Sequence, residues 1–231
     1  MKYNIRVNEV KSEDSQIKAF ATVTFADSLL VRNIAIIERR DSGDLFVSMP
    51  SYRTNEVTEK GEPIYRDVCN PITKEFYEEL TKNILEAYDK RQSLGKNGLD
   101  VGEGSQLDFS VKVTPIDRED SSLRGLGRVF LGDQFVVGNV KLIEGKKGMF
   151  ISMPDYRTEK YRDNKPVYRE IVYPVTKEFR EKLYGAFESE YKTAREQKAA
   201  AKTEPEPEPE RKHEKTASLK GKTVKEPAMA R

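Results

Sequence analysis

The sequence predicts an α+β fold that is built twice within one chain of 231 residues. The segment SMPSYRT at 48–54 returns as SMPDYRT at 152–158, and the block at 65–76 returns at 168–179. In each copy the apolar pattern changes from the two-residue period of strands to the 3.6-residue period of a helix. Two long copies differ from the many short repeats of a solenoid. We therefore expect two linked modules that pack against each other as a pseudo-dimer.

The first module has the pattern of an antiparallel β-meander. Alternating apolar side chains, such as Ala19, Ala21 and Val23, are typical of strands with one buried face. Turn residues at 41–44 separate two strands, and Pro50 ends the next one because proline cannot donate to a strand ladder. The expected strands are Tyr3–Val10, Gln16–Phe25, Leu29–Glu38, Leu45–Met49 and Ile64–Cys69, with Ser51–Pro63 as a polar loop.

A helix is expected after the strands of each module. Thr73 is a suitable N-cap for a helix over 74–90, whose apolar stripe we expect to cover the sheet. The second module repeats this order, with Thr176 as the cap of a helix that continues toward Ala201. Its expected strands are Phe109–Ile116, Leu123–Leu131, Gln134–Glu144 and Met149–Met153.

These patterns divide the chain into four parts. The modules occupy 1–90 and 107–200, and the glycine-rich segment 91–106 is expected to be a linker, flexible at its far end. Residues 201–231 contain a run of alternating glutamate and proline followed by scattered lysines, and His213 is the sole histidine of the chain. Such a segment cannot bury enough apolar surface to fold, so we expect a disordered charged tail.

The composition excludes several classes of protein. The single cysteine, Cys69, permits no intramolecular disulfide and is expected to be a small buried residue. The N-terminus lacks the apolar core of a signal peptide, and no stretch is apolar enough to span a membrane. We expect a cytoplasmic protein with no membrane partner.

The sequence shows no catalytic constellation. Neither module contains a histidine, and there is no metal-ligand cluster or phosphate-binding loop. Asp27 and Asp133 recur, but both lie in expected turns, where aspartate usually bonds to local backbone. We expect no enzymatic activity, no cofactor, no metal and no small-molecule substrate.

Basic and aromatic residues are the candidate functional groups. The net charge is only +2, with roughly 13 basic and 16 acidic residues in 3–95 against roughly 17 and 14 in 107–195. Arginine binds phosphate bidentately, a neighbouring tyrosine can stack on a base, and the first turn of a helix favours anions. The expected nucleic-acid-binding residues are Arg157, Arg169, Lys177, Arg53, Arg66, Lys74, Tyr156, Tyr52, Lys146 and Lys147. Alternatively, Arg66 and Arg169 are solvated strand charges or members of cross-strand ion pairs.

The repeated motif resembles the SpoVG family of bacterial septation and sporulation regulators. The resemblance rests on Phe46–Thr54 with Tyr65–Ile72, and on Phe150–Thr158 with Tyr168–Val175. It implies a small antiparallel sheet with a C-terminal helix, which is commonly a homodimer, and a role in nucleic-acid-binding regulation. This chain departs from the family pattern in carrying two modules and tyrosines at 52 and 156, where a basic residue is common.

Two functions remain open from the sequence. The first is a regulator that binds DNA or RNA through phosphate contacts, chiefly through the second module. The second is a non-catalytic protein-interaction adaptor that has lost nucleic-acid binding. In both cases the linker is long enough for the modules to pair within one chain, so we expect a monomer that mimics a dimer.

Overall fold

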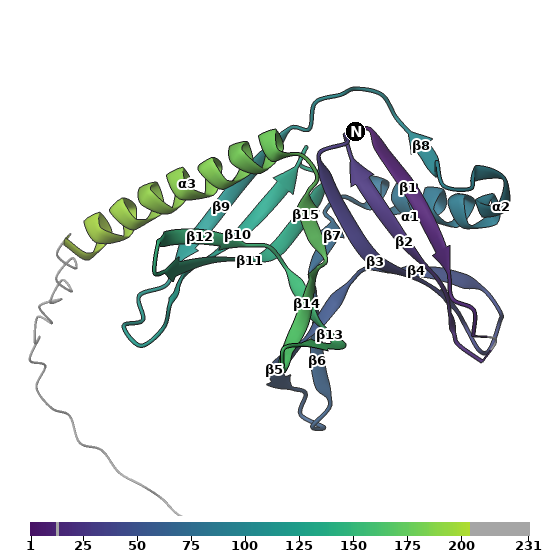
Figure 1. Ribbon diagram of the computed structural model, residues 1–231, viewed down its shortest axis with the longest axis horizontal. Helices are drawn as coiled ribbons and strands as arrows, with labels where there is room; N and C mark the ends of the chain where they lie inside the picture. Colours follow the sequence, from purple (N-terminus) through teal and green to yellow (C-terminus); the bar gives the residue numbers. More distant parts are fainter. Residues whose placement is uncertain (13, 204–231) are drawn as a thin grey trace, which may run out of the picture.

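The computed structural model describes residues 1–12 and 14–203. It confirms the α+β fold with two antiparallel meanders, each followed by a helix (Figure 1). Module 1 contains β1 (Tyr3–Glu9), β2 (Ile17–Phe25), β3 (Leu29–Glu38), β4 (Leu45–Ser48), β5 (Ser51–Val57), β6 (Pro63–Asp67), β7 (Cys69–Pro71) and α1 (Lys74–Asp89). Module 2 contains β9 (Phe109–Pro115), β10 (Leu123–Leu131), β11 (Phe135–Gly145), β12 (Gly148–Ser152), β13 (Asp155–Arg162), β14 (Lys165–Glu170), β15 (Val172–Pro174) and α3 (Lys177–Thr203). Most of the expected tail lies outside the described residues.

Each helix covers one face of its own sheet, as the apolar stripe predicts. The Thr73 hydroxyl accepts a hydrogen bond from the Phe76 amide at 3.2 Å, and Thr176 caps α3 in the same way. The buried side chains of the two helices are Phe76, Leu80, Ile84 and Ala87 in α1, and Phe179, Leu183, Phe187 and Tyr191 in α3. Within residues 1–12 and 14–203, no helix covers the opposite face of either sheet (Figure 1).

The modules exchange their last strands. β7 of module 1 pairs with β11 of module 2, placing Cys69 opposite Val137. Reciprocally, β15 of module 2 pairs with β3 of module 1, placing Val172 opposite Val31. The expected pseudo-dimer is therefore confirmed in a specific form, because each sheet is completed by a strand from the other module.

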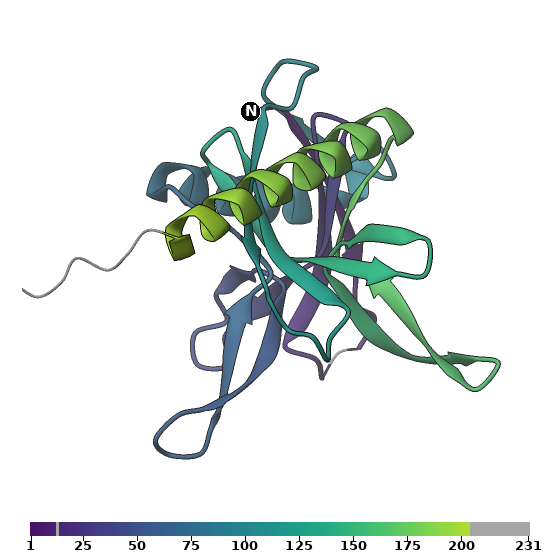
Figure 2. The same cartoon turned by 90° about the vertical axis from the view of Figure 1, so that its left-hand side faces the viewer.

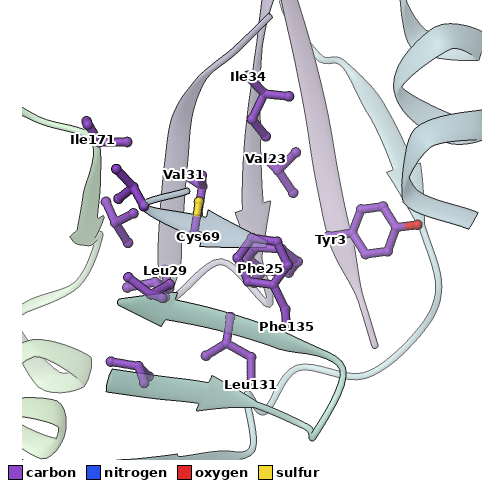
Figure 3. Packing of buried hydrophobic residues seen from close by; sticks show 14 of the residues in the cluster. Tyr3, Val23, Phe25, Leu29, Val31, Ile34, Cys69, Leu131, Phe135 and Ile171 are labelled. Atoms are coloured by element: carbon purple, nitrogen blue, oxygen red, sulfur yellow. The ribbon is translucent and has the colours of Figure 1, made fainter. Parts of the chain in front are cut away.

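One hydrophobic core runs across both modules. Phe135 of module 2 packs against Phe25 of module 1, with ring centroids 5.0 Å apart (Figure 3). It also packs against Phe76 of module 1, whose ring centroid is 6.5 Å away. Cys69 is buried in the same cluster, as expected of a small apolar residue. Because the core is shared, the two modules form one packed body.

The linker carries more regular structure than a flexible coil. It contains a short helix, α2 (Arg91–Leu94), and a strand, β8 (Leu99–Val101), which pairs with β1 at the edge of the first sheet. Gly98 permits this close approach, since a Cβ there would lie 2.4 Å from the Ile5 carbonyl oxygen. The linker thus becomes one border of the sheet of module 1.

Two hairpins project from the body, and here the sequence prediction is wrong. The expected polar loop Ser51–Pro63 is largely strand β5, and β5–β6 forms a ribbon that we name arm 1, residues 51–67. Its counterpart β13–β14 is arm 2, residues 155–170. An exposed ribbon buries neither face, so it leaves no apolar alternation in the sequence. Figure 2 shows the two arms spreading to opposite sides of the molecule.

Candidate nucleic-acid interface

Each arm pairs tyrosine with arginine across its two strands. In arm 1, Tyr52 lies opposite Arg66 and Arg53 lies opposite Tyr65. Arm 2 repeats this arrangement with its own residues, in the pairs Tyr156 with Arg169 and Arg157 with Tyr168. Neighbouring residues of a strand point to opposite faces, so each face of each arm carries one arginine beside one tyrosine.

The repeated threonine of the motif has a structural role in both arms. The Thr54 hydroxyl donates to the Ile64 carbonyl at 3.0 Å, and the Thr158 hydroxyl donates to the Val167 carbonyl at 2.7 Å. Each bond lies where the strand register shifts. The threonines therefore hold the irregular part of each hairpin together and are not themselves candidate ligand contacts.

Arm 1 is electrostatically weak as an anion site. Arg66 forms a 2.7 Å ion pair with Glu56 on the facing strand, which is the cross-strand alternative that the sequence left open. The arm has three basic residues and four acidic ones, a net charge of −1. Arg53 and Tyr65 remain on the exposed surface, where Tyr65 keeps 60% of its side-chain exposure.

Arm 2 presents its arginines more freely. It has five basic and four acidic residues, a net charge of +1. Arg157 donates to the Tyr161 hydroxyl, and its guanidinium lies 5.5 Å from the centre of that ring. Within the described part of the chain, neither Arg157 nor Arg169 forms an ion pair with a carboxylate. Both guanidinium groups therefore keep positions for an external anion.

The other expected lysines do not join the arms. Lys74 and Lys177 are the first residues of their helices, and their side chains are 81% and 88% exposed. The ammonium nitrogen of each lies 3.7 and 3.6 Å, respectively, from the carboxylate oxygen of a glutamate one turn later. Figure 1 shows the start of α3 at the end of β15 that lies away from arm 2. Lys146 and Lys147 form the turn between β11 and β12, in a third location. The expected binding set is therefore divided among separate parts of the surface.

The structure adds residues that the sequence interpretation missed. The Arg32 guanidinium stacks over the Tyr173 ring, 4.7 Å from its centre. Arg32 belongs to β3 of module 1 and Tyr173 to β15 of module 2, so strand exchange creates the contact. The available signal was an arginine beside an asparagine, Asn33, within a strand that is otherwise apolar as far as Ile37.

The reactive groups considered from the sequence, Cys69 and Asp27, are buried or paired. Burial raises the pKa of the Cys69 thiol, so the reactive thiolate is disfavoured. Asp27 forms a 3.1 Å ion pair with Lys2 in a turn. Over residues 1–12 and 14–203, no three histidine, cysteine or acidic side chains gather as metal ligands. The helices in those ranges are too short or too polar to cross a membrane.

The fold and the two arms define a class: a strand-exchanged pair of α+β modules, each with a projecting arginine- and tyrosine-bearing hairpin. The family model SpoVG matches residues 1–90 and 108–193. These matches cover most of both modules, and the chain belongs to the SpoVG family.

Curated relatives correspond to one module each. A protein from Treponema denticola is 37% identical over 86 residues, which cover 37% of this chain and 83% of the relative. A protein from Thermoanaerobacter sp. is 34% identical over 84 residues, covering 36% of this chain and 86% of the relative. A protein from Aster yellows witches'-broom phytoplasma is 36% identical over 81 residues, covering 35% and 76%. All three carry the name "Putative septation protein SpoVG".

Proposed function

We propose that this protein is a nucleic-acid-binding regulator that contacts phosphate groups chiefly through arm 2. The observation that carries this proposal is the absence of carboxylate partners for Arg157 and Arg169 among the described residues, although Glu159, Asp163 and Glu170 lie in the same arm. A guanidinium without a carboxylate partner can bind a phosphate bidentately, and Arg157 keeps further N–H donors besides the one that bonds to Tyr161. The septation name of the relatives supports a regulatory role in cell division or sporulation.

Binding of this kind is dominated by the release of counterions. Each neutralised phosphate contributes about 0.9 to the slope of log affinity against log salt concentration on duplex DNA. The double variant Arg157→Ala/Arg169→Ala should therefore lower affinity about tenfold and reduce this slope by about two.

The matched control is the same pair of changes in arm 1. Arg53→Ala/Arg66→Ala should weaken binding less, because Arg66 is already engaged by Glu56. Fluorescence anisotropy with random DNA and RNA at several salt concentrations measures both effects. Unchanged isotherms after all four substitutions would contradict the proposal. Complete loss of binding on deletion of 202–231 would instead place the binding site in the tail.

The second candidate is a protein-interaction adaptor. It is favoured by the Arg66–Glu56 ion pair and the net negative charge of arm 1, which reduce the attraction of the first module for phosphate. The same titrations separate the two functions, because an adaptor would bind neither DNA nor RNA even at low salt.

A further inference from the structure

A groove runs over the outer face of the first sheet, the face that α1 does not cover. In β1, Tyr3 and Ile5 point into the core, so Asn4, Arg6 and Asn8 point outward. Three adjoining hollows of about 580, 400 and 310 Å³ follow this face. Figure 1 shows the open face of β1, β2 and β3 between β8 on one side and β15 on the other. The groove is therefore a joint product of module 1, the linker and module 2.

The basic groups of the groove have no acidic partners. Within the described residues, Arg6, Arg32 and Arg169 form no ion pair. The carboxylates at the linker end are both engaged, Asp27 by Lys2 at 3.1 Å and Asp100 by the Asn4 amide at 2.9 Å. The amide leaves the negative charge of Asp100 in place, so the linker end of the groove is not basic. The two hollows between Arg6 and arm 2 are lined by basic side chains and by no carboxylate.

Aromatic rings accompany these arginines. Phe20 on β2 is 37% exposed and lines the hollow nearest arm 2. Tyr173 and Tyr156 line the same hollow, the first stacked on Arg32 and the second opposite Arg169. Rings that alternate with guanidinium groups offer surfaces for bases and donors for phosphates in one groove.

We infer that this groove binds a single-stranded segment of nucleic acid, with bases stacked on the aromatic rings and phosphates at the arginines. The inference rests on the proposed function and specifies its ligand. In a duplex the faces of the bases are stacked on one another. The aromatic rings that line the groove therefore could not stack on them. Unpaired bases can leave their stack and enter such a groove.

The corresponding face of module 2 lacks the arginine–tyrosine stack. The backbone amide of Arg32 donates to the Ile171 carbonyl at 2.9 Å, and the backbone amide of Gly138 donates to the Val68 carbonyl at 2.8 Å. The two bonds occupy the same place in the two exchanged strand pairs, so Gly138 is the counterpart of Arg32. By the same strand register, Asn70 occupies in the second sheet the position that Tyr173 occupies in the first. Module 2 keeps a basic face, with Lys112 over the Phe130 ring at 5.9 Å. We therefore expect one single-strand site per chain.

The pseudo-symmetry supplies the variant for the test. Arg32→Gly/Tyr173→Asn places in the first sheet the residues that the second sheet, which contains β11, already carries at the same strand positions. With a labelled oligothymidylate of about 12 nucleotides, anisotropy should show about tenfold weaker binding, because stacking surfaces are lost. Binding to a duplex of equal length should change less than about twofold, and far-UV circular dichroism should be unchanged.

The reciprocal variant tests the same idea as a gain of function. Gly138→Arg/Asn70→Tyr installs the stack on module 2, where a Cβ at 138 would meet only the Val68 carbonyl oxygen at 3.6 Å. Titration with the oligothymidylate should then give two sites per chain instead of one. Photocrosslinking of a bromouracil oligonucleotide to the wild-type protein should label the peptides that contain Phe20 and Tyr173.

The possible failures are distinguishable. Unchanged binding of the oligothymidylate by Arg32→Gly/Tyr173→Asn, or an equal loss on the duplex, would overturn the single-strand groove. The proposed function would survive that result as long as the arm 2 variants still weaken binding. If the wild-type protein binds no nucleic acid at any salt concentration, both proposals fall.

Discussion

Phe135→Ala tests whether the two modules stabilise each other as the shared core requires. The Phe135 ring comes from module 2, is fully buried, and packs on two rings of module 1 at 5.0 and 6.5 Å. Truncation of a buried phenylalanine to alanine costs about 3–5 kcal/mol. A chain of this size loses about 2–4 °C in Tm for each kcal/mol, so the expected shift is about 10 °C.

Scanning calorimetry is the appropriate measurement, because it reports how many units unfold. We expect one transition for the wild type and one for the variant, with equal van't Hoff and calorimetric enthalpies. Phe150→Ala is the matched control, since Phe150 is also in module 2 but is 51% exposed, and it should cost less than about 1 kcal/mol. Two separate transitions, with only the one from module 2 shifted, would refute the shared core.

Three further predictions concern mass, packing and pH. Light scattering should give a mass near 26.5 kDa, and a value near twice that would contradict the expected monomer. Gly127→Ala should destabilise the protein by about 1–3 kcal/mol in urea unfolding, because its Cβ would lie 2.4 Å from the buried Phe187 ring. Gly185→Ala meets nothing within 4 Å and should stabilise α3 by about 0.5–1 kcal/mol; a reversed order would contradict the packing. Burial raises the pKa of Tyr3 above its ordinary 10.0, so the unfolded chain loses this proton first and stability should fall above that pH. Tyr3→Phe should make the fall shallower, and equal slopes would disprove this assignment.

The regular elements could be predicted from the sequence because burial leaves a periodic record. Val23 in β2 and Leu80 in α1 are fully buried and follow the two- and 3.6-residue periods that predicted them. The exchange of β7 and β15 left no such record. A three-residue strand has the same apolar pattern whichever sheet it joins, so its partner is decided only by tertiary packing.

The candidate site was predictable only in part, for the same reason. Arg157 and Arg169 were recognisable from the repeated motif, and both lie on arm 2 in adjacent cross-strand pairs. Arg32 and Asn33 looked like a short polar interruption of β3, and the stacking of Arg32 depends on Tyr173, which belongs to the other module. The sequence holds both residues but not the strand pairing that brings them into contact.

Strand exchange within one chain also changes how the protein can evolve. In a symmetric dimer one gene encodes both halves, so every substitution appears at two places at once. Here the two halves are encoded separately, and a change such as arginine at 32 with glycine at 138 affects a single face. Because both halves lie on one chain they are always present one to one, and each sheet takes a strand from the other half. A substitution can thus change the binding surface of one half and leave the surface of the other half unaltered.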